Sequence, residues 1–176
     1  MLPPFALSQP QSLGDALQAL ANDDEIQAFS GGTNLIPDLR SKRETCRNFI
    51  SLQALDELRY IQRQGTRITL GARTTITDIL QDHDMPSDAP ALYAAAGKFA
   101  GTMVRNVATI GGNVCCGSPA ADTVPALLTL DAEVSLSSAS GERSVALCDF
   151  YTGYKQSAKR ADELLTSMSW TVPAEN

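Results

Sequence analysis

The stretch VRNVATIGGNVCCGSPAADTVPALLTL, residues 104–130, holds the features around which the chain is organised. Its apolar, β-rich lead-in, Val104–Ile110, is followed by the paired glycines Gly111 and Gly112. Paired glycines lose more conformational entropy on folding than other residues and offer no side chain to pack. They therefore indicate either a turn with positive φ or a place where another group approaches the backbone closely. Consecutive N–H groups without Cβ atoms can also form a concave site for an anion such as phosphate.

The same pattern occurs a second time, nearer the N-terminus. A short apolar strand, Gln27–Phe29, leads into Ser30–Asn34 (SGGTN), after which a helical turn is expected. We call Ser30–Asn34 the first glycine loop and Thr109–Asn113 (TIGGN) the second glycine loop. One such loop alone is best explained as a tight turn, but two of them favour a ligand with two phosphates. Neither loop matches the Walker A or the G-x-G-x-x-G pattern, which points away from the common nucleotide-binding folds.

Three motifs carry a resemblance to a known family. SGGTNLIPDLR (residues 30–40), VRNVATIGGN (residues 104–113) and SPAADTVPALLTLDAEV (residues 118–134) are similar to the FAD-binding subunit or domain of the molybdenum hydroxylases. That family includes xanthine dehydrogenase and the medium subunit of aerobic carbon monoxide dehydrogenase. The resemblance covers nearly the whole chain in order, and the pair of glycine motifs makes it specific.

The resemblance implies an α+β fold, the two-lobed FAD-binding domain of the molybdopterin dehydrogenase (PCMH/vanillyl-alcohol-oxidase-like) type. Residues 1–55 would form an N-terminal α/β lobe with the first glycine loop, and residues 56–176 a second α+β lobe with the second. The cofactor would lie extended between them. Family members continue for roughly another hundred residues, about one domain. We expect that C-terminal domain to be absent here, with an exposed apolar patch where it would pack.

In the resembled family the two loops hold the pyrophosphate of FAD. The first loop would use its backbone N–H groups, aided by the N-terminus of the next helix. The second loop would add the Thr109 hydroxyl and the Asn113 amide as donors. Asp122, an acceptor-only carboxylate, would bind sugar or ribityl hydroxyls, or else act as an N-cap for the following helix.

The resemblance extends to further residues around the cofactor. Phe99 and Ala100 would lie near the flavin, although simple helix packing explains them equally well. The full set of residues expected to bind FAD is Phe29, Ser30, Gly31, Gly32, Thr33, Asn34, Leu35, Phe99, Ala100, Thr109, Gly111, Gly112, Asn113, Cys115, Ala121, Asp122, Leu165 and Thr166.

The implied function is electron transfer within a cytoplasmic heterotrimer. Electrons would pass from a large molybdenum-cofactor subunit, through a small subunit with two [2Fe–2S] clusters, to FAD and then to NAD, a quinone or oxygen. No catalytic residues are expected, because a flavin carries the redox chemistry and the protein supplies binding and orientation. One alternative is a truncated, non-redox docking subunit that keeps the fold without cofactor. Another is an unrelated module for a phosphorylated metabolite.

Composition excludes several other classes of protein. The 176 residues carry a net charge of −6, which disfavours nucleic acid as a partner. No apolar run approaches the ~20 residues of a membrane span, and the N-terminus lacks the pattern of a secretory signal. The four cysteines form no C-x-x-C pair and follow no zinc spacing, so we expect neither a metal site nor an iron–sulfur cluster. His83, the single histidine, lies in an Asp-rich loop, where we expect it to be solvated rather than catalytic.

Periodicity and turn signals predict the remaining elements. Ser12 and Asp15 form a capping-box pattern ahead of the first helix, and the pair Thr74-Thr75 gives a cap signal at the start of the helix expected at residues 74–80. Strands are expected at residues 26–29, 48–52, 58–63, 67–70, 131–137, 143–147 and 163–172, the last with alternating residue types. Helices are expected at residues 13–20, 33–40, 74–80, 90–98 and 124–130.

Overall fold

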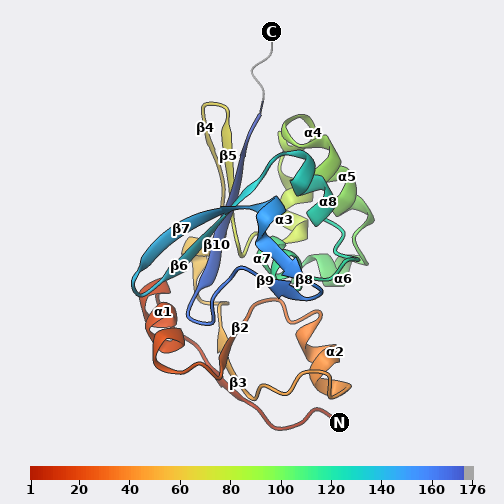
Figure 1. Ribbon diagram of the computed structural model, residues 1–176. Helices are drawn as coiled ribbons and strands as arrows, with labels where there is room; N and C mark the ends of the chain where they lie inside the picture. The colour runs from red at the N-terminus through yellow and green to blue at the C-terminus, as the bar shows by residue number, and fades with distance from the viewer. Residues whose placement is uncertain (173–176) are drawn as a thin grey trace.

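The computed structural model describes residues 1–172, which build two separate main sheets (Figure 1). The smaller sheet has three parallel strands in the order β1-β3-β2. They are β1 (Ala6–Ser8), β3 (Asn48–Ser51) and β2 (Ile26–Phe29), with the helices α1 (Leu13–Asn22) and α2 (Leu35–Arg40) between them in the chain. This sheet therefore comes entirely from the first third of the chain.

The larger sheet is antiparallel and has the last strand of the chain at its centre. Its order is β4-β5-β10-β6-β7, and the short hairpin β8-β9 stands apart from it. The bounds are β4 (Ile61–Gln64), β5 (Arg67–Gly71), β6 (Glu133–Ser138), β7 (Gly141–Ala146), β8 (Tyr151–Gly153), β9 (Gln156–Ser157) and β10 (Leu164–Thr171).

Strand β10 is buried from Leu164 to Trp170. The predicted alternation of residue types is present, since Met168 and Trp170 belong to the main hydrophobic core while Ser167 and Ser169 alternate with them. Burial does not alternate with it, because Ser167 and Ser169 are buried as well. The position of β10 at the centre of the sheet, between β5 and β6, accompanies this burial of both sets of side chains.

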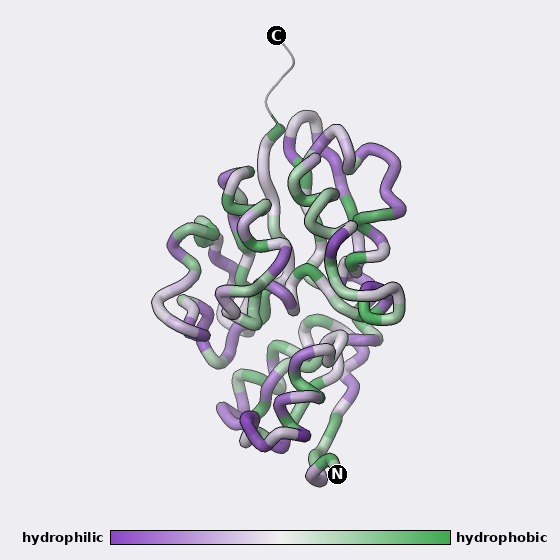
Figure 2. The backbone as a smooth tube through the Cα atoms, turned by 90° about the vertical axis from the view of Figure 1, so that its right-hand side faces the viewer, coloured by the Kyte–Doolittle hydropathy of each residue, from purple (hydrophilic) through white to green (hydrophobic). Residues whose placement is uncertain are grey.

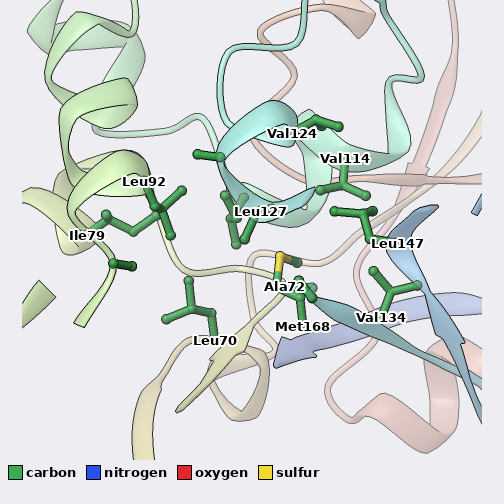
Figure 3. Close-up of a cluster of buried hydrophobic side chains, with 14 of the residues drawn as sticks. Leu70, Ala72, Ile79, Leu92, Val114, Val124, Leu127, Val134, Leu147 and Met168 are labelled. Carbon is green, nitrogen blue, oxygen red and sulfur yellow. The ribbon is translucent and has the colours of Figure 1, made fainter. Parts of the chain in front are cut away.

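A layer of short helices covers one face of the larger sheet (Figure 1). Leu70, Ile79, Leu92, Leu127 and Met168 point toward one another between these helices and the sheet (Figure 3). Along the tube in Figure 2, hydrophobic and hydrophilic residues alternate within the helical segments, as expected when each helix buries one face. The remaining helices of the chain are η1 (Asp56–Leu58), which packs with the smaller sheet, and α3 (Ile76–Gln81), α4 (Met85–Asp88), α5 (Pro90–Lys98), α6 (Thr102–Arg105), α7 (Ile110–Cys115), α8 (Val124–Thr129) and α9 (Leu147–Phe150).

Helix starts follow the predicted capping chemistry in two places. Ser12 Oγ accepts a hydrogen bond from the Asp15 N–H at 3.1 Å, which caps α1. At α3 the Thr75 and Asp78 side chains cap each other's backbone N–H groups in a full capping box. Both prevent unsatisfied donors at a helix start, so the sequence signals confirmed here have a direct energetic basis.

The prediction of a β-rich lead-in at Val104–Ile110 is wrong. Helix α6 occupies Thr102–Arg105, and a short connection then enters α7 at Ile110. Val104 and Ala108 face inward while Met103 and Val107 are exposed, which is a helical spacing of four residues. A short apolar run carries no period of its own, so strand and helix could not be separated from it.

Candidate functional site

A cleft of about 1000 Å³ brings the two glycine loops together. The first glycine loop leaves β2 and passes below α7 on its way to α2 (Figure 1). The second glycine loop forms the first turn of α7, with Thr109 as its N-cap. Both loops line the cleft although their first residues, Ser30 and Thr109, are 79 residues apart in the chain.

The first glycine loop presents unused backbone donors to the cleft. Within residues 1–172, the N–H groups of Gly31, Gly32, Thr33 and Asn34 donate to no protein acceptor. Gly32 has a φ of +68°, a left-handed backbone conformation that residues other than glycine adopt only with strain. Unbonded successive N–H groups around a left-handed residue are the backbone feature from which anion-binding nests are built.

The second glycine loop uses its backbone donors within the protein, which leaves the side-chain groups that were predicted to contribute there. The Gly111 N–H donates to the Ala72 carbonyl at 3.0 Å, and the Asn113 N–H to the Thr109 carbonyl at 3.0 Å. The Gly112 N–H donates to Thr109 Oγ1 at 3.2 Å. Neither glycine has a positive φ, because both lie inside α7. What this loop offers the cleft is the exposed face of Gly112 and side-chain groups.

The Asn113 side chain has its direction fixed by Thr123. Asn113 Oδ1 accepts from the Thr123 N–H at 3.2 Å and from the Thr123 hydroxyl at 2.6 Å. Its Nδ2 is therefore the group left to donate toward the cleft that Asn113 lines. The predicted role of the Asn113 amide as a donor fits this arrangement.

Direct contacts join the two sides of the cleft. Ser30 Oγ lies 3.2 Å from Thr109 Oγ1, and Asn34 Nδ2 lies 2.9 Å from Cys116 Sγ. Gly31 packs against the connection before the second loop, where a Cβ would come within 1.9 Å of the Val107 carbonyl oxygen. The two loops are thus held in a fixed relation before any ligand binds.

Almost all residues predicted to bind the cofactor lie on this cleft. Asp122 is exposed there and does not cap α8, whose N-cap is Thr123 without a side-chain hydrogen bond. Buried Phe99 and Leu165 supply apolar wall. The other predicted residues that line it are Ser30, Gly31, Gly32, Thr33, Asn34, Leu35, Ala100, Thr109, Gly111, Gly112, Asn113, Cys115 and Ala121.

Phe29 and Thr166, the other two residues predicted to bind FAD, are not among the residues that line the cleft. The Phe29 ring lies beside Gly32, 2.8 Å from where a Cβ of that glycine would be. The Thr166 hydroxyl contacts Ser137 Oγ at 3.1 Å and donates to the Ser135 carbonyl at 3.3 Å, so it faces β6. Phe29 therefore packs against the first glycine loop, and Thr166 bonds within the larger sheet.

Two lysines on the cleft were missed by the sequence analysis. Lys155, in the β8-β9 hairpin, lies 4.0 Å from Asp38 of α2. Lys159 donates from Nζ to the carbonyls of Arg160 at 2.9 Å and Glu163 at 3.1 Å. Their segment has no helical or strand period, so no sequence signal marked them. They add positive charge to a cleft that also contains acidic side chains.

Two groups beside the second loop have raised pKa values. Desolvation by surrounding protein raises the pKa of the Cys115 thiol to about 11, although part of its side chain is exposed along the cleft. Desolvation also raises the pKa of the Tyr151 phenol, which donates to the Val114 carbonyl at 3.0 Å. Because a thiolate is the reactive form of cysteine, Cys115 is not an activated nucleophile at neutral pH.

Other kinds of site find no support in the part of the chain that the structure describes. Residues 1–172 contain no group of three His, Cys, Asp or Glu side chains able to hold a metal ion. His83 is fully exposed beside Asp84, as predicted for a solvated loop residue. None of the helices in this range is both long enough and apolar enough to cross a membrane.

Comparison with known proteins identifies the family. A sequence model of the FAD binding domain in molybdopterin dehydrogenase matches residues 3–174, so the chain belongs to that family. The "Xanthine dehydrogenase FAD-binding subunit" of Escherichia coli O157:H7 is 34% identical over 89% of this chain and 54% of its own. The "Glyceraldehyde dehydrogenase medium chain" of Sulfolobus acidocaldarius is 34% identical over 98% of this chain and 62% of its own.

Solved structures agree with the family assignment. Quinoline 2-oxidoreductase from Pseudomonas putida 86 has a TM-score of 0.94 at 28% identity, covering 99% of this chain and 61% of that one. Carbon monoxide dehydrogenase from Hydrogenophaga pseudoflava has a TM-score of 0.95 at 26% identity, with 99% and 61% covered. The cofactor of this family is FAD, and its relatives are subunits of oxidoreductases. The chain spans a little over half the length of these relatives.

Proposed function

We propose that this chain holds FAD for electron transfer in a molybdenum hydroxylase. A large partner subunit carries the molybdenum cofactor and hydroxylates the substrate, and a small partner subunit carries two [2Fe–2S] clusters. Electrons pass from these clusters by way of FAD to an external acceptor, which is NAD, a quinone or oxygen. The complex works in the cytoplasm. The observation that carries the proposal is the meeting of both glycine loops on one cleft.

The cleft divides the binding of FAD between its two sides. The unused N–H groups of the first glycine loop bind the pyrophosphate, aided by the start of α2. Asn113 Nδ2 adds a donor from the other side, and the Asp122 carboxylate accepts from a sugar or ribityl hydroxyl. Phe99 and Leu165 cover apolar parts of the cofactor. When bound, FAD supplies the redox chemistry, and the chain supplies binding and orientation.

This division corresponds to two lobes, residues 1–55 and residues 56–176, with FAD between them. The position of the first glycine loop after the small sheet and of the second beside the large sheet supports it. The contacts between Ser30 and Thr109 and between Asn34 and Cys116 tie the lobes at the cleft. We therefore expect FAD to raise the cooperativity with which the two lobes unfold.

The test is a visible absorbance and flavin-fluorescence titration of the purified chain with FAD. Gly112→Val fills the exposed face of the second glycine loop, where a Cβ would meet only Thr109 Oγ1 at 2.9 Å. Gly14→Val is the matched control, because Gly14 also lies in the first turn of a helix and its Cβ would have only Ser12 Oγ nearby, at 3.8 Å. We expect one FAD per wild-type and Gly14→Val chain, and loss of binding in Gly112→Val.

Other outcomes identify the alternatives. A folded wild-type chain that binds no FAD, yet forms a complex with the partner subunits, would support a docking subunit without cofactor. Binding of ADP or inorganic phosphate without binding of FAD would favour a module for a phosphorylated metabolite. Equal FAD binding by wild type and Gly112→Val would remove the second glycine loop from the site.

A further inference from the structure

Arg105 is an arginine whose guanidinium binds backbone carbonyls only. It lies at the end of α6 and is half-buried. Its Nε donates to the Phe99 carbonyl, and its Nη2 donates to the carbonyls of Gly97 at 2.7 Å and Ala100 at 3.0 Å. None of the ion pairs found in residues 1–172 involves it. Salt-bridge formation therefore does not explain this side chain.

The Gly97 carbonyl lies in the last turn of α5, and the Phe99 and Ala100 carbonyls belong to the turn between α5 and α6, which contains a strained residue. Ala100 has a φ of +35°, in the left-handed region that residues with a Cβ rarely adopt. Such a conformation persists only where surrounding contacts fix it. The planar fork of Arg105 bridges the carbonyls before and at Ala100, so it fixes the turn from one side. It also satisfies carbonyls at the end of α5, where a positive charge is favoured.

The opposite side of the same turn forms the wall of the cleft. Phe99 and Ala100 line the cleft together with Val104 and Ala108, whereas Arg105 is not among the residues that line it. The Arg105 side chain is thus separated from the cleft by the backbone it holds. Any shift of the Ala100 turn would move the Phe99 ring, which is buried against the main hydrophobic core.

We propose that Arg105 is a positioning residue for the cofactor. It holds the Ala100 turn in its left-handed conformation and thereby sets the position of the Phe99–Ala100 wall against which FAD binds. This inference rests on the proposed function, because it takes FAD as the occupant of the cleft. Arg105 acts through the turn and does not touch the ligand. Its effect should therefore depend on whether residue 100 is strained.

The experiment is a cycle of Arg105→Gln, Ala100→Gly and the double variant, with Arg105→Lys added. Glycine adopts positive φ without a steric penalty, so Ala100→Gly removes the strain that Arg105 opposes. Arg59→Gln is the control, because Arg59 is an exposed arginine that pairs with Asp78 away from the cleft. The readouts are the Kd for FAD from flavin-fluorescence quenching and the visible circular dichroism of the bound flavin. Urea unfolding measures stability separately.

We expect Arg105→Gln to weaken FAD binding about tenfold and to change the flavin circular dichroism. The affinity of Arg105→Lys for FAD should lie between those of Arg105→Gln and wild type, because a lysine ammonium cannot bridge the carbonyls as the planar guanidinium of arginine does. Ala100→Gly in the Arg105→Gln background should recover most of the lost affinity, and Arg59→Gln should bind FAD like wild type.

The proposal is overturned if Arg105→Gln and Arg105→Lys bind FAD with wild-type Kd and circular dichroism. It is equally overturned if Ala100→Gly gives no recovery, since Arg105 would then serve only general stability. If Arg105→Gln does not fold, the Kd for FAD is compared between Arg105→Lys and the Arg105→Lys/Ala100→Gly double variant. A recovery of affinity in the double variant supports the proposal, and no recovery overturns it. A wild-type chain that binds no FAD contradicts the proposed function itself, a result distinct from either of these.

Discussion

The two glycine loops share a sequence pattern but differ in how they use their backbone. In the first glycine loop, the N–H groups from Gly31 to Asn34 have no protein acceptor within residues 1–172. In the second, Gly111, Gly112 and Asn113 donate to Ala72 or to Thr109. The first loop is therefore suited to receive an anion, whereas the second is a packed helix start that places side chains at the cleft.

Glycine is required for a different reason in each case. Gly32 adopts a positive φ, while Gly111 gives room, since a Cβ there would lie 2.8 Å from the Ala72 carbonyl oxygen and from the Ala72 Cβ. A pair of glycines in a sequence thus indicates a backbone requirement but does not say which one. Substitutions by alanine separate the two reasons, because alanine adds only the Cβ.

The largest effect is expected for Gly31→Ala. Its Cβ would lie 1.9 Å from the Val107 carbonyl oxygen and 2.7 Å from the Val107 carbonyl carbon, and backbone atoms cannot rotate away. We expect a loss of about 3 kcal/mol or more in the free energy of unfolding, at the upper end of the usual cost of overpacking. Urea unfolding followed by the fluorescence of buried Trp170 measures it. A loss below about 1 kcal/mol would mean that the two loops move apart easily.

Gly111→Ala should have the next largest effect. The added methyl would press on Ala72, whose backbone is fixed by a hydrogen bond from its N–H to the Thr166 carbonyl at 2.9 Å. We expect about 1–3 kcal/mol of lost stability, measured in the same unfolding assay. FAD affinity of the folded fraction should change little, because the Gly111 N–H already bonds within the protein. A selective loss of affinity without a loss of stability would contradict this account.

Capping and periodicity made much of the fold predictable. Ser12, Thr75 and Asp78 mark helix starts through local hydrogen bonds, so a short window of sequence contains the whole cause. For the second glycine loop the sequence left open a positive-φ turn, a close approach to the backbone or an anion site, and the structure shows a close approach to Ala72. The loop's donors are consumed by Ala72 and by the α7 turn, and the Ala72 contact comes from another part of the chain.

Contacts with distant parts of the chain also decide what the residues around the cleft do, and a local stretch of sequence does not reveal them. Thr166 was assigned to the cofactor from the family resemblance, whereas its hydroxyl faces β6. Arg105 gave no signal, because its role depends on the path of the turn at Ala100 rather than on its neighbours in sequence. Family resemblance located the cleft-lining residues, whereas their donors and acceptors emerged only from tertiary contacts.

Gly32→Ala tests the first loop by conformation rather than by space. Alanine at a φ of +68° costs about 1–2 kcal/mol, and its Cβ would also lie 2.8 Å from the far end of the Phe29 ring. We expect a loss of stability in that range together with weaker FAD binding, because the turn that aligns the free N–H groups relaxes. The Kd for FAD is measured by fluorescence quenching at low temperature and without denaturant, so that the variant stays folded. An unchanged Kd would show that these N–H groups do not bind the pyrophosphate.

The smallest effect concerns the hydroxyl pair that joins the loops. Ser30 Oγ and Thr109 Oγ1 lie 3.2 Å apart, and Thr109 Oγ1 also accepts from the Gly112 N–H at 3.2 Å. A double-mutant cycle of Ser30→Ala and Thr109→Val should give a coupling free energy of about 0.5–1 kcal/mol, typical of one neutral hydrogen bond. Thr109→Val should cost more than Ser30→Ala, because it also leaves α7 without its cap. If the two substitutions are simply additive, this hydroxyl pair does not hold the loops together, and the packing at Gly31 and the contact between Asn34 and Cys116 remain to do so.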